Sequence, residues 1–355
     1  MWPGSAGSGT ARHGRASGAL HGTYLPGRWR MTDGEPGEGH PDTRDVAGMA
    51  DVASDRFDEA QLSETRSDET GFDEARLDQA LSFLARRLSG DFTVDPFGFD
   101  EDLTESVLLP ALRMLYRHWF RVEVRGMENV PSDGGALIVA NHAGTFPLDS
   151  LMLQVAVHDE HPAARHLRTL AATLVFQLPV VSDVARKNGS TLACNEDVAE
   201  LLSRDELVGV WPEGFKGIGK PFAERYQLQR FGRGGFVSAA IRSGAPIVPC
   251  SIVGAEETYP MVGNLGFLAR LLRLPYAPIT PTFPWLGPLG LVPLPSKWMI
   301  EFGEPLATDQ YEVGAAEDPM VVFELTDNVR DVIQQTLHGL LEKRGSAFPQ
   351  FSRSE

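Results

Sequence analysis

Cysteine is scarce, because the 355 residues contain only Cys194 and Cys250. Two cysteines are too few for the disulfide framework that holds small secreted domains together. Cys250 follows the apolar stretch "APIVP", which predicts a small buried side chain. The sequence also contains no His/Cys cluster at ligand spacing, so it predicts no metal or redox cofactor. We expect a reduced, cytoplasmic protein that depends on its hydrophobic core.

Long apolar runs are also missing. No stretch of 18 or more uncharged apolar residues occurs, so the sequence predicts no membrane-spanning helix. The N-terminal segment lacks the apolar region of a secretory signal. Neither absence excludes a protein that lies on a membrane surface.

Positive charge is in deficit. The chain has 32 Lys and Arg against 48 Asp and Glu, a formal net charge of −16. Binding to nucleic acid requires a basic surface that neutralises phosphates, so nucleic acid is excluded as an expected partner. A local basic patch remains compatible with this composition.

The N-terminal part changes character along its length. Residues 1–72 are rich in Gly, Ser, Arg, Asp and Glu and poor in large apolar side chains, which predicts a disordered acidic tail. Met31 within it is a second candidate start. Residues 73–120 form the next expected region, with a helical pattern that ends at Gly90 and a second over 103–120. We expect Pro110 to kink or break the second helix, which is a candidate membrane-surface helix.

Residues 121–345 read as one domain in which strands alternate with helices. The strand patterns include "GGALIVANH", "ELVGVWPEG" and "APIVPCSIVG", and helical patterns such as "PLDSLMLQVAVHD" lie between them. Such alternation predicts an α/β fold with a mostly parallel sheet flanked by helices. Sites in these sheets gather beyond the carboxyl ends of the strands. His142 follows one such strand, and Pro212-Glu213-Gly214 follows another.

The segment 259–298 interrupts this alternation. It is apolar, rich in proline and glycine, and contains only three basic residues. Soluble proteins seldom give so much irregular sequence to apolar side chains unless these pack or face lipid. Two interpretations stay open: a loop-rich lid packed on the core, and a surface that meets a membrane.

Three motifs occur in a fixed order: "NHAGTFPLD", then "WPEGFKGIGKPFAERYQLQRFGRGG", then "APIVP". Over roughly Phe92 to Pro305 this set resembles the phospholipid and glycerol acyltransferase family, which 1-acylglycerol-3-phosphate acyltransferase typifies. The resemblance implies that His142 and Asp149 are catalytic. Histidine is suited to act as a general base near neutral pH, and a carboxylate partner fixes its tautomer. No G-x-S-x-G elbow offers a serine nucleophile, so the acceptor hydroxyl is expected to attack the thioester directly.

The spacing of the first motif departs from the family pattern. The usual arrangement separates the His and the Asp by four residues, but that position holds Pro147 and the Asp stands two residues later. A wider turn through "AGTF" would return Asp149 to His142, as in a looser branch of the family. The alternative for Asp149 is a carboxylate that only stabilises the first turn of a helix.

The resemblance also implies a set of substrate-binding residues. It assigns Glu213 and Gly214 to acceptor binding, and Lys216 takes the place of the usual arginine without its bidentate geometry. Arg186 corresponds loosely to a family arginine that meets acceptor phosphate. The further cations of this stretch suit an anionic partner, or alternatively form a solvated or headgroup-facing basic surface; they include Lys220, Arg225, Arg230 and Arg233.

The function implied by the resemblance is transfer of a fatty acyl group from acyl-CoA or acyl carrier protein to a hydroxyl of a glycerolipid. The expected acceptor is lysophosphatidate or a similar lysophospholipid, and a neutral mono- or diacylglycerol is the alternative. A thioester hydrolase and a non-catalytic lipid-binding protein are the alternatives outside this class. The expected location is the cytoplasm, peripheral on the inner face of the cell membrane, with no cofactor besides the acyl donor.

Overall fold

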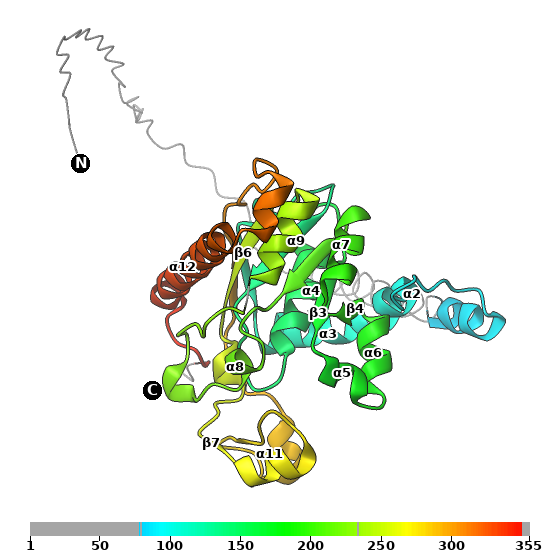
Figure 1. Ribbon diagram of the computed structural model, residues 1–355. Coiled ribbons are helices and arrows are strands. Elements are labelled where there is room, and N and C mark those ends of the chain that lie inside the picture. The colour runs from blue at the N-terminus through cyan, green and yellow to red at the C-terminus, as the bar shows by residue number, and fades with distance from the viewer. Residues whose placement is uncertain (1–77, 79, 233, 350–355) are drawn as a thin grey trace, which may run out of the picture. The chain divides into compact units, whose positions relative to one another are not determined.

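The computed structural model describes residues 78, 80–232 and 234–349 (Figure 1). The expected acidic tail, residues 1–72, and Arg233 lie outside the described residues. All structural statements below concern the described part of the chain.

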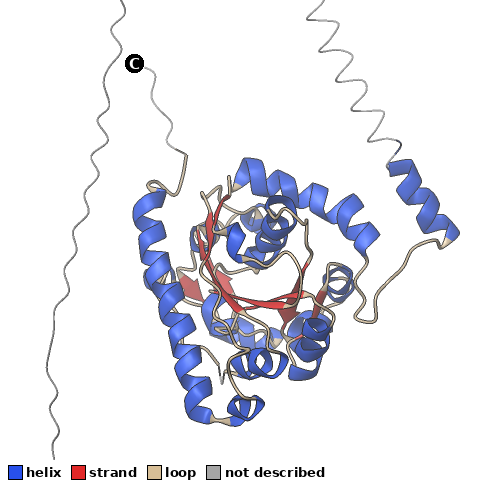
Figure 2. Cartoon of the chain, turned by 90° about the horizontal axis from the view of Figure 1, so that it is seen from above, coloured by secondary structure: helices blue, strands red, loops and turns tan. Residues whose placement is uncertain are grey.

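A seven-stranded sheet forms the centre of the domain (Figures 1 and 2). Its strands are β1 (Glu123–Arg125), β2 (Ala136–Ala140), β3 (Leu167–Ala171), β4 (Ser190–Leu192), β5 (Leu207–Val210), β6 (Ile247–Val253) and β9 (Met299–Phe302). They lie in the order β1-β9-β6-β2-β5-β3-β4. Neighbouring strands pair in parallel except β6 and β9, which are antiparallel. The mostly parallel sheet expected from the sequence is therefore confirmed.

Helices cover both faces of this sheet (Figure 2). The α-helices are α2 (Glu101–Leu103), α3 (Leu109–Met114), α4 (Leu148–Glu160), α5 (Thr173–Gln177), α6 (Val181–Lys187), α7 (Asn195–Ser203), α8 (Phe215–Ile218), α9 (Gly235–Ser243), α10 (Ala255–Thr258), α11 (Gly266–Leu272) and α12 (Pro319–Arg344). The π-helical turns are η1 (Thr104–Leu108) and η2 (Leu115–Trp119). The 3₁₀ turns are η3 (Met127–Asn129), η4 (Phe222–Glu224), η5 (Gly287–Leu291) and η6 (Val313–Glu317). Residues 80–89 are also helical.

The buried strand β2 shows how the layers are built. Its five residues are all buried, as expected for a central strand covered on both faces. Alternate side chains point to opposite faces, so Leu137 and Val139 join the core formed with α7, α9 and α12. Ala136 and Ile138 join the second core, formed with α4 and the segment that ends at Phe120. The fold is thus a three-layer α/β/α arrangement.

The N-terminal helix continues past Pro110 without a break. It runs from Glu101 to Trp119 through α2, η1, α3 and η2. Proline lacks an N–H and its ring crowds the preceding turn, which normally kinks a helix. Here Pro110 follows a π-helical turn, in which the N–H of Leu109 bonds to the carbonyl of Thr104. The sequence led us to expect a kink or a break at this position. The chain instead stays helical, with a wider turn just before the proline.

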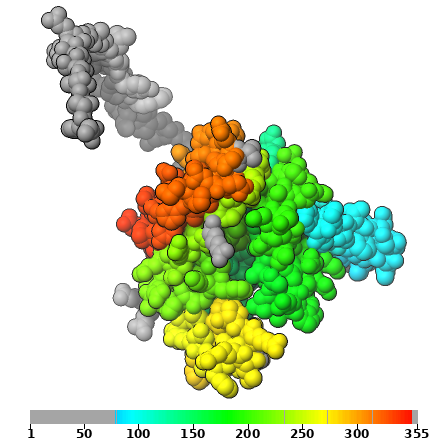
Figure 3. All heavy atoms as spheres, in the orientation of Figure 1, coloured from blue at the N-terminus to red at the C-terminus, as the bar shows by residue number. Residues whose placement is uncertain are grey.

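The apolar segment 259–298 forms a small separate layer of structure. It contains α11 and a two-stranded antiparallel sheet of β7 (Gly263–Asn264) and β8 (Pro278–Ile279). Figure 3 shows the α11 region as a yellow projection from the body of the domain. Many of its large apolar side chains are exposed; the most exposed are Val262, Phe267, Leu271, Trp285, Leu286 and Leu289. No described helix is both long and apolar enough to traverse a bilayer.

Candidate active site

The carboxyl end of β2 places His142 beyond the sheet. The residue before it, Asn141, is fully buried and bonds to both backbone groups of Ile252 on β6. Its amide nitrogen donates to the Ile252 carbonyl at 3.0 Å, and its amide oxygen accepts from the Ile252 N–H at 2.7 Å. Asn141 therefore fixes the exit of β2 against the neighbouring strand, so His142 leaves the sheet from a rigid point.

His142 and Asp149 are in direct contact. The imidazole Nδ1 lies 2.7 Å from Oδ2 of Asp149, whose side chain is fully buried in the first turn of α4. An ionised carboxylate only accepts hydrogen bonds, so Nδ1 carries the proton and Nε2 holds the free lone pair. Oδ2 also accepts the Ala143 N–H at 2.9 Å, which fixes the position of the carboxylate. This is the arrangement that a histidine general base requires.

The loop between the two residues accommodates the long spacing. Helix α4 starts at Leu148, so the two additional residues extend the turn before the helix and leave Asp149 in its first turn. Gly144 has φ +81°, and a Cβ there would lie 2.8 Å from the carbonyl oxygen of Ala255. Only glycine meets both conditions at low cost. The wider turn inferred from "AGTF" is what the structure shows.

Glu213 holds the backbone of His142. Its Oε1 accepts the His142 N–H at 2.9 Å, and its Oε2 accepts the Gln229 N–H at 2.6 Å. Gly217 of α8 packs against the backbone of His142 so closely that a Cβ there would lie 2.7 Å from the His142 carbonyl oxygen. The Pro-Glu-Gly motif thus positions the histidine through its main chain. Both oxygens of Glu213 already have protein partners, and its expected contact with the acceptor stays a prediction.

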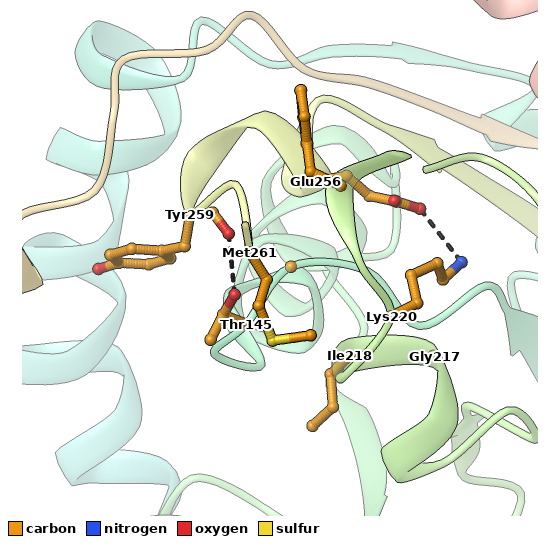
Figure 4. A pocket seen from close by; sticks show the side chains of 9 residues that line it. Thr145, Gly217, Ile218, Lys220, Glu256, Tyr259 and Met261 are labelled. Atoms are coloured by element: carbon orange, nitrogen blue, oxygen red, sulfur yellow. Dashed lines mark hydrogen bonds and ion pairs between the residues drawn. The ribbon is translucent and has the colours of Figure 1, made fainter. Parts of the chain in front are cut away.

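Lys220 belongs to a buried charge cluster beside this site. Its Nζ lies 3.2 Å from Oε1 of Glu256 and 3.4 Å from Oε2 of Glu213, and all three side chains are buried. A cavity of about 10 Å³, space for about one water molecule, lies between Lys220, Glu256 and the loop after β2 (Figure 4). The ammonium group of Lys220 is thus paired with two buried carboxylates of the protein itself. Its predicted contact with the substrate stays a prediction.

The buried Glu256 should make stability depend on pH. Burial is the largest influence and raises the pKa of its carboxyl from 4.5 to about 7, although Lys220 opposes the shift. Between these two pH values the folded protein binds more protons than the unfolded chain, so the free energy of unfolding falls as pH rises. Glu256→Gln should remove this dependence. The free energy of unfolding of the variant, measured relative to that of wild type, should therefore increase as pH rises from about 4.5 through about 7.

Urea unfolding of wild type and Glu256→Gln across that pH range measures the difference directly. Glu224→Gln is the matched control, because Glu224 is exposed in the neighbouring turn η4. Parallel stability curves for wild type and Glu256→Gln would contradict the assignment.

The remaining predicted cations lie on the surface. Lys216 is exposed on α8, two residues after Gly214. Arg225 is exposed and stacks over the ring of Phe222 at 4.5 Å. Arg186 is exposed on α6, where it lies 4.6 Å from the ring centroid of Phe176. The structure therefore brings His142, Asp149, Glu213 and Lys220 into one linked group, and it leaves Lys216, Arg225 and Arg186 at the surface.

Two features of the site were not found from the sequence. Trp211 lies directly before the Pro-Glu-Gly motif, with its ring centroid 5.8 Å from that of His142, and its buried Nε1 has no hydrogen-bond partner among the described residues. The loop after His142 is also tied to the apolar segment. Thr145 donates to the carbonyl of Tyr259 at 2.8 Å and its own carbonyl accepts from the Tyr276 hydroxyl. Adjacency in the sequence hinted at Trp211, whereas nothing local indicated Tyr276.

Comparisons of sequence and of structure with known proteins each found matches. A family model described as acyltransferase matches residues 121–253, which include His142, Asp149 and the Pro-Glu-Gly motif. The crystal structure of the 1-acyl-sn-glycerophosphate acyltransferase PlsC from Thermotoga maritima matches with a TM-score of 0.43 and 18% identity, covering 75% of this chain and 97% of that one.

Sequence relatives fall into two groups. An uncharacterized protein of Mycobacterium tuberculosis is 58% identical over 290 residues, 81% of each chain, and one of Mycobacterium leprae is 60% identical over 266 residues, 75% of this chain and 72% of the other. A human protein named DGAT1/2-independent enzyme synthesizing storage lipids is 29% identical over 171 residues, 47% of this chain and 51% of its own. The family match, together with the ordered motifs, places residues 121–253 of the chain in the acyltransferase family.

Proposed function

We propose that this protein transfers a fatty acyl group from acyl-CoA or acyl carrier protein to a hydroxyl of a glycerolipid. The observation that carries the proposal is the His142–Asp149 pair at the carboxyl end of β2, with Nδ1 bonded to a buried carboxylate and Nε2 left as a base. A general base such as the His142 imidazole is the group that activates the acceptor hydroxyl for attack on the thioester.

The reaction proceeds without a covalent enzyme intermediate. The acceptor hydroxyl attacks the thioester carbonyl carbon while its proton passes to Nε2 of His142. The C–S bond of the tetrahedral intermediate then breaks, and the leaving thiolate takes the proton back from the imidazolium. Asp149 stabilises the imidazolium between these steps. The products are an oxygen ester and a free thiol.

The developing oxyanion needs a hydrogen-bond donor. Of the two glycines considered from the sequence, Gly214 already donates its N–H to the Trp211 carbonyl at 3.0 Å. The Gly144 N–H meets no protein acceptor within the described ranges, and it lies two residues from His142. We therefore assign Gly144 as the backbone donor to the oxyanion.

A lysophosphatidate or similar lysophospholipid is the first candidate acceptor. Lys216 and Arg225 are exposed cations in the stretch that follows Glu213, and cations are what a phosphate-bearing acceptor requires. A neutral glyceride is the second candidate. It is favoured by the name of the human relative, which describes an enzyme that synthesises storage lipids, and by the burial of Lys220 among carboxylates.

The test is acyl transfer by the purified full chain from labelled acyl-CoA, and separately from acyl carrier protein, to a panel of acceptors. The panel contains glycerol 3-phosphate, lysophosphatidate, other lysophospholipids, monoacylglycerol and diacylglycerol. Product on a lysophospholipid supports the first candidate, and product only on a neutral glyceride supports the second. Consumption of acyl-CoA without an acylated lipid would identify a hydrolase instead. Vesicle binding with neither activity would indicate a lipid-binding protein.

We also propose that the protein works as a peripheral protein on the inner face of the cell membrane, where its lipid substrates lie. Segment 259–298 has no acidic residue, and its exposed apolar side chains form a surface suited to insertion among lipid headgroups. Thr145, in the loop that follows His142, is hydrogen-bonded to Tyr259 and Tyr276 of the same segment. Membrane seating and access of the acyl chain to the base would then involve the same segment.

Vesicle binding should be weakened by polar substitutions in this segment. Phe267, Trp285 and Leu289 are 78%, 71% and 72% exposed, so replacing all three with serine removes apolar surface and leaves the core intact. Each apolar side chain that enters lipid contributes on the order of 1 kcal/mol, so we expect at least about tenfold weaker partitioning. Sedimentation with phosphatidylglycerol-containing vesicles measures it.

The matched control replaces Met320 and Phe323, which are 73% and 57% exposed on α12. It should bind vesicles as wild type does. Equal loss in both variants would show that exposed apolar area in general, rather than this segment, determines binding.

A further inference from the structure

Two histidines and a glutamate converge at a place remote from His142. Glu105 lies in η1, His158 near the end of α4, and His166 directly before β3. One ligand atom from each lies within 4.8 Å of the others. His158 stands nine residues after Asp149 on α4, roughly 14 Å along the helix axis. The group therefore lies toward the amino ends of β2 and β3, and the catalytic pair lies at the carboxyl end of β2.

The distances within the group suit a coordinated ion better than direct hydrogen bonds. The Glu105 Oε1 atom lies 3.5 Å from Nε2 of His166 and 3.7 Å from Nε2 of His158. These separations exceed those of good N–H···O bonds. In a tetrahedral zinc site with bonds of about 2.0–2.2 Å, neighbouring ligand atoms lie roughly 3.3–3.6 Å apart. A fourth ligand atom is close, since Oε1 of Glu101 also lies 3.5 Å from Nε2 of His166.

The contacts of His158 direct its Nε2 toward this group. Nδ1 of His158 lies 3.1 Å from Oδ1 of Asp159, so Nε2 is left to face the group. A carboxylate behind a ligating histidine is the usual support of a metal site. Arg113 also approaches this Nδ1 at 3.5 Å, but its guanidinium is paired with Asp159 at 2.7 Å.

We propose that Glu105, His158 and His166, with Glu101 as a fourth ligand, form a binding site for a divalent transition metal of the zinc class. Imidazole and carboxylate donors together suit Zn²⁺. The ligands come from the N-terminal helix on one side and from α4 and the start of β3 on the other. The bound ion would therefore fasten the N-terminal helix to the α/β domain, as a structural site with four protein ligands.

The test uses the full chain, stripped of metal with a chelator and titrated with Zn²⁺ by calorimetry and with Co²⁺ by visible absorption. We expect wild type to bind one equivalent more than His166→Gln, His158→Gln and Glu105→Gln, and to show the absorption of tetrahedral Co²⁺. The thermal midpoint of wild type should rise with Zn²⁺, while those of the variants should not. His118→Gln is the matched control, because His118 is exposed on the same N-terminal helix.

Three outcomes would overturn the proposal: no Zn²⁺ bound by wild type, equal binding by wild type and the three variants, or loss of binding in His118→Gln as well. Glu105 is 51% exposed at its side chain, so Glu105→Gln keeps the test valid if a histidine variant fails to fold. His142→Ala should retain the bound equivalent, which separates this site from the proposed catalytic one.

Discussion

Acyl transfer by the His142→Ala variant is expected to fall by about 10²–10⁴-fold, the usual contribution of a general base. The substitution removes Nε2, the atom that takes the proton of the acceptor hydroxyl. It keeps the backbone N–H of residue 142, which donates to Glu213. The loss should appear in kcat, because the proton is transferred during the reaction and not during substrate binding. Steady-state kinetics on the preferred acceptor measure both parameters.

Folding is the first control for this variant. The His142 side chain is 13% exposed, and its removal leaves the Asp149 carboxylate bound to the Ala143 N–H. Thermal unfolding should therefore show a folded protein, and vesicle binding should match wild type. The exposed His118 supplies a matched substitution, His118→Ala, which should keep full activity. Near-normal transfer by His142→Ala would contradict a base at this position.

The fold class could be predicted because it depends on local patterns. Alternating strands and helices appear in the sequence as short apolar runs such as "ALIVA" separated by longer helical patterns, and this repeat leads to a parallel sheet. Pairing between distant segments has no such signature. The antiparallel pairing of Val253 with Met299 joins residues 46 positions apart, and nothing near either residue encodes it.

The candidate site was predicted in part for the same reason. His142 and Asp149 are seven residues apart, so one turn and the start of one helix determine whether they meet. Lys220 is different, since its partners Glu213 and Glu256 come from separate elements and only the fold reveals that they surround it. Glu105, His158 and His166 of the proposed metal site are likewise too widely spaced for any motif of metal-binding residues.

The Asp149→Asn variant should lose roughly 10²–10⁴-fold in kcat while keeping its fold, because the amide disturbs the tautomer of His142. In wild type, Oδ2 accepts from both His142 Nδ1 and the Ala143 N–H, and Oδ1 accepts from the Ser150 N–H. An asparagine has one oxygen and one NH₂ group. With the oxygen toward His142, the NH₂ opposes the Ser150 N–H. With the amide reversed, the NH₂ faces both Nδ1 and the Ala143 N–H, and Nδ1 must give up its proton.

With the reversed amide, the imidazole proton moves to Nε2, which then cannot accept the proton of the attacking hydroxyl. The resulting fall in kcat distinguishes a catalytic Asp149 from one that only stabilises its helix. Asp183→Asn is the matched comparison, since Asp183 is an exposed carboxylate in the first turn of α6. Loss of a helix-dipole interaction costs about 0.3–1 kcal/mol of stability in either variant and leaves kcat unchanged. A large fall in kcat for Asp149→Asn alone would therefore assign it to the catalytic pair. Small and equal effects in both variants would leave Asp149 as a carboxylate that only stabilises its helix, and His142 without this partner in catalysis.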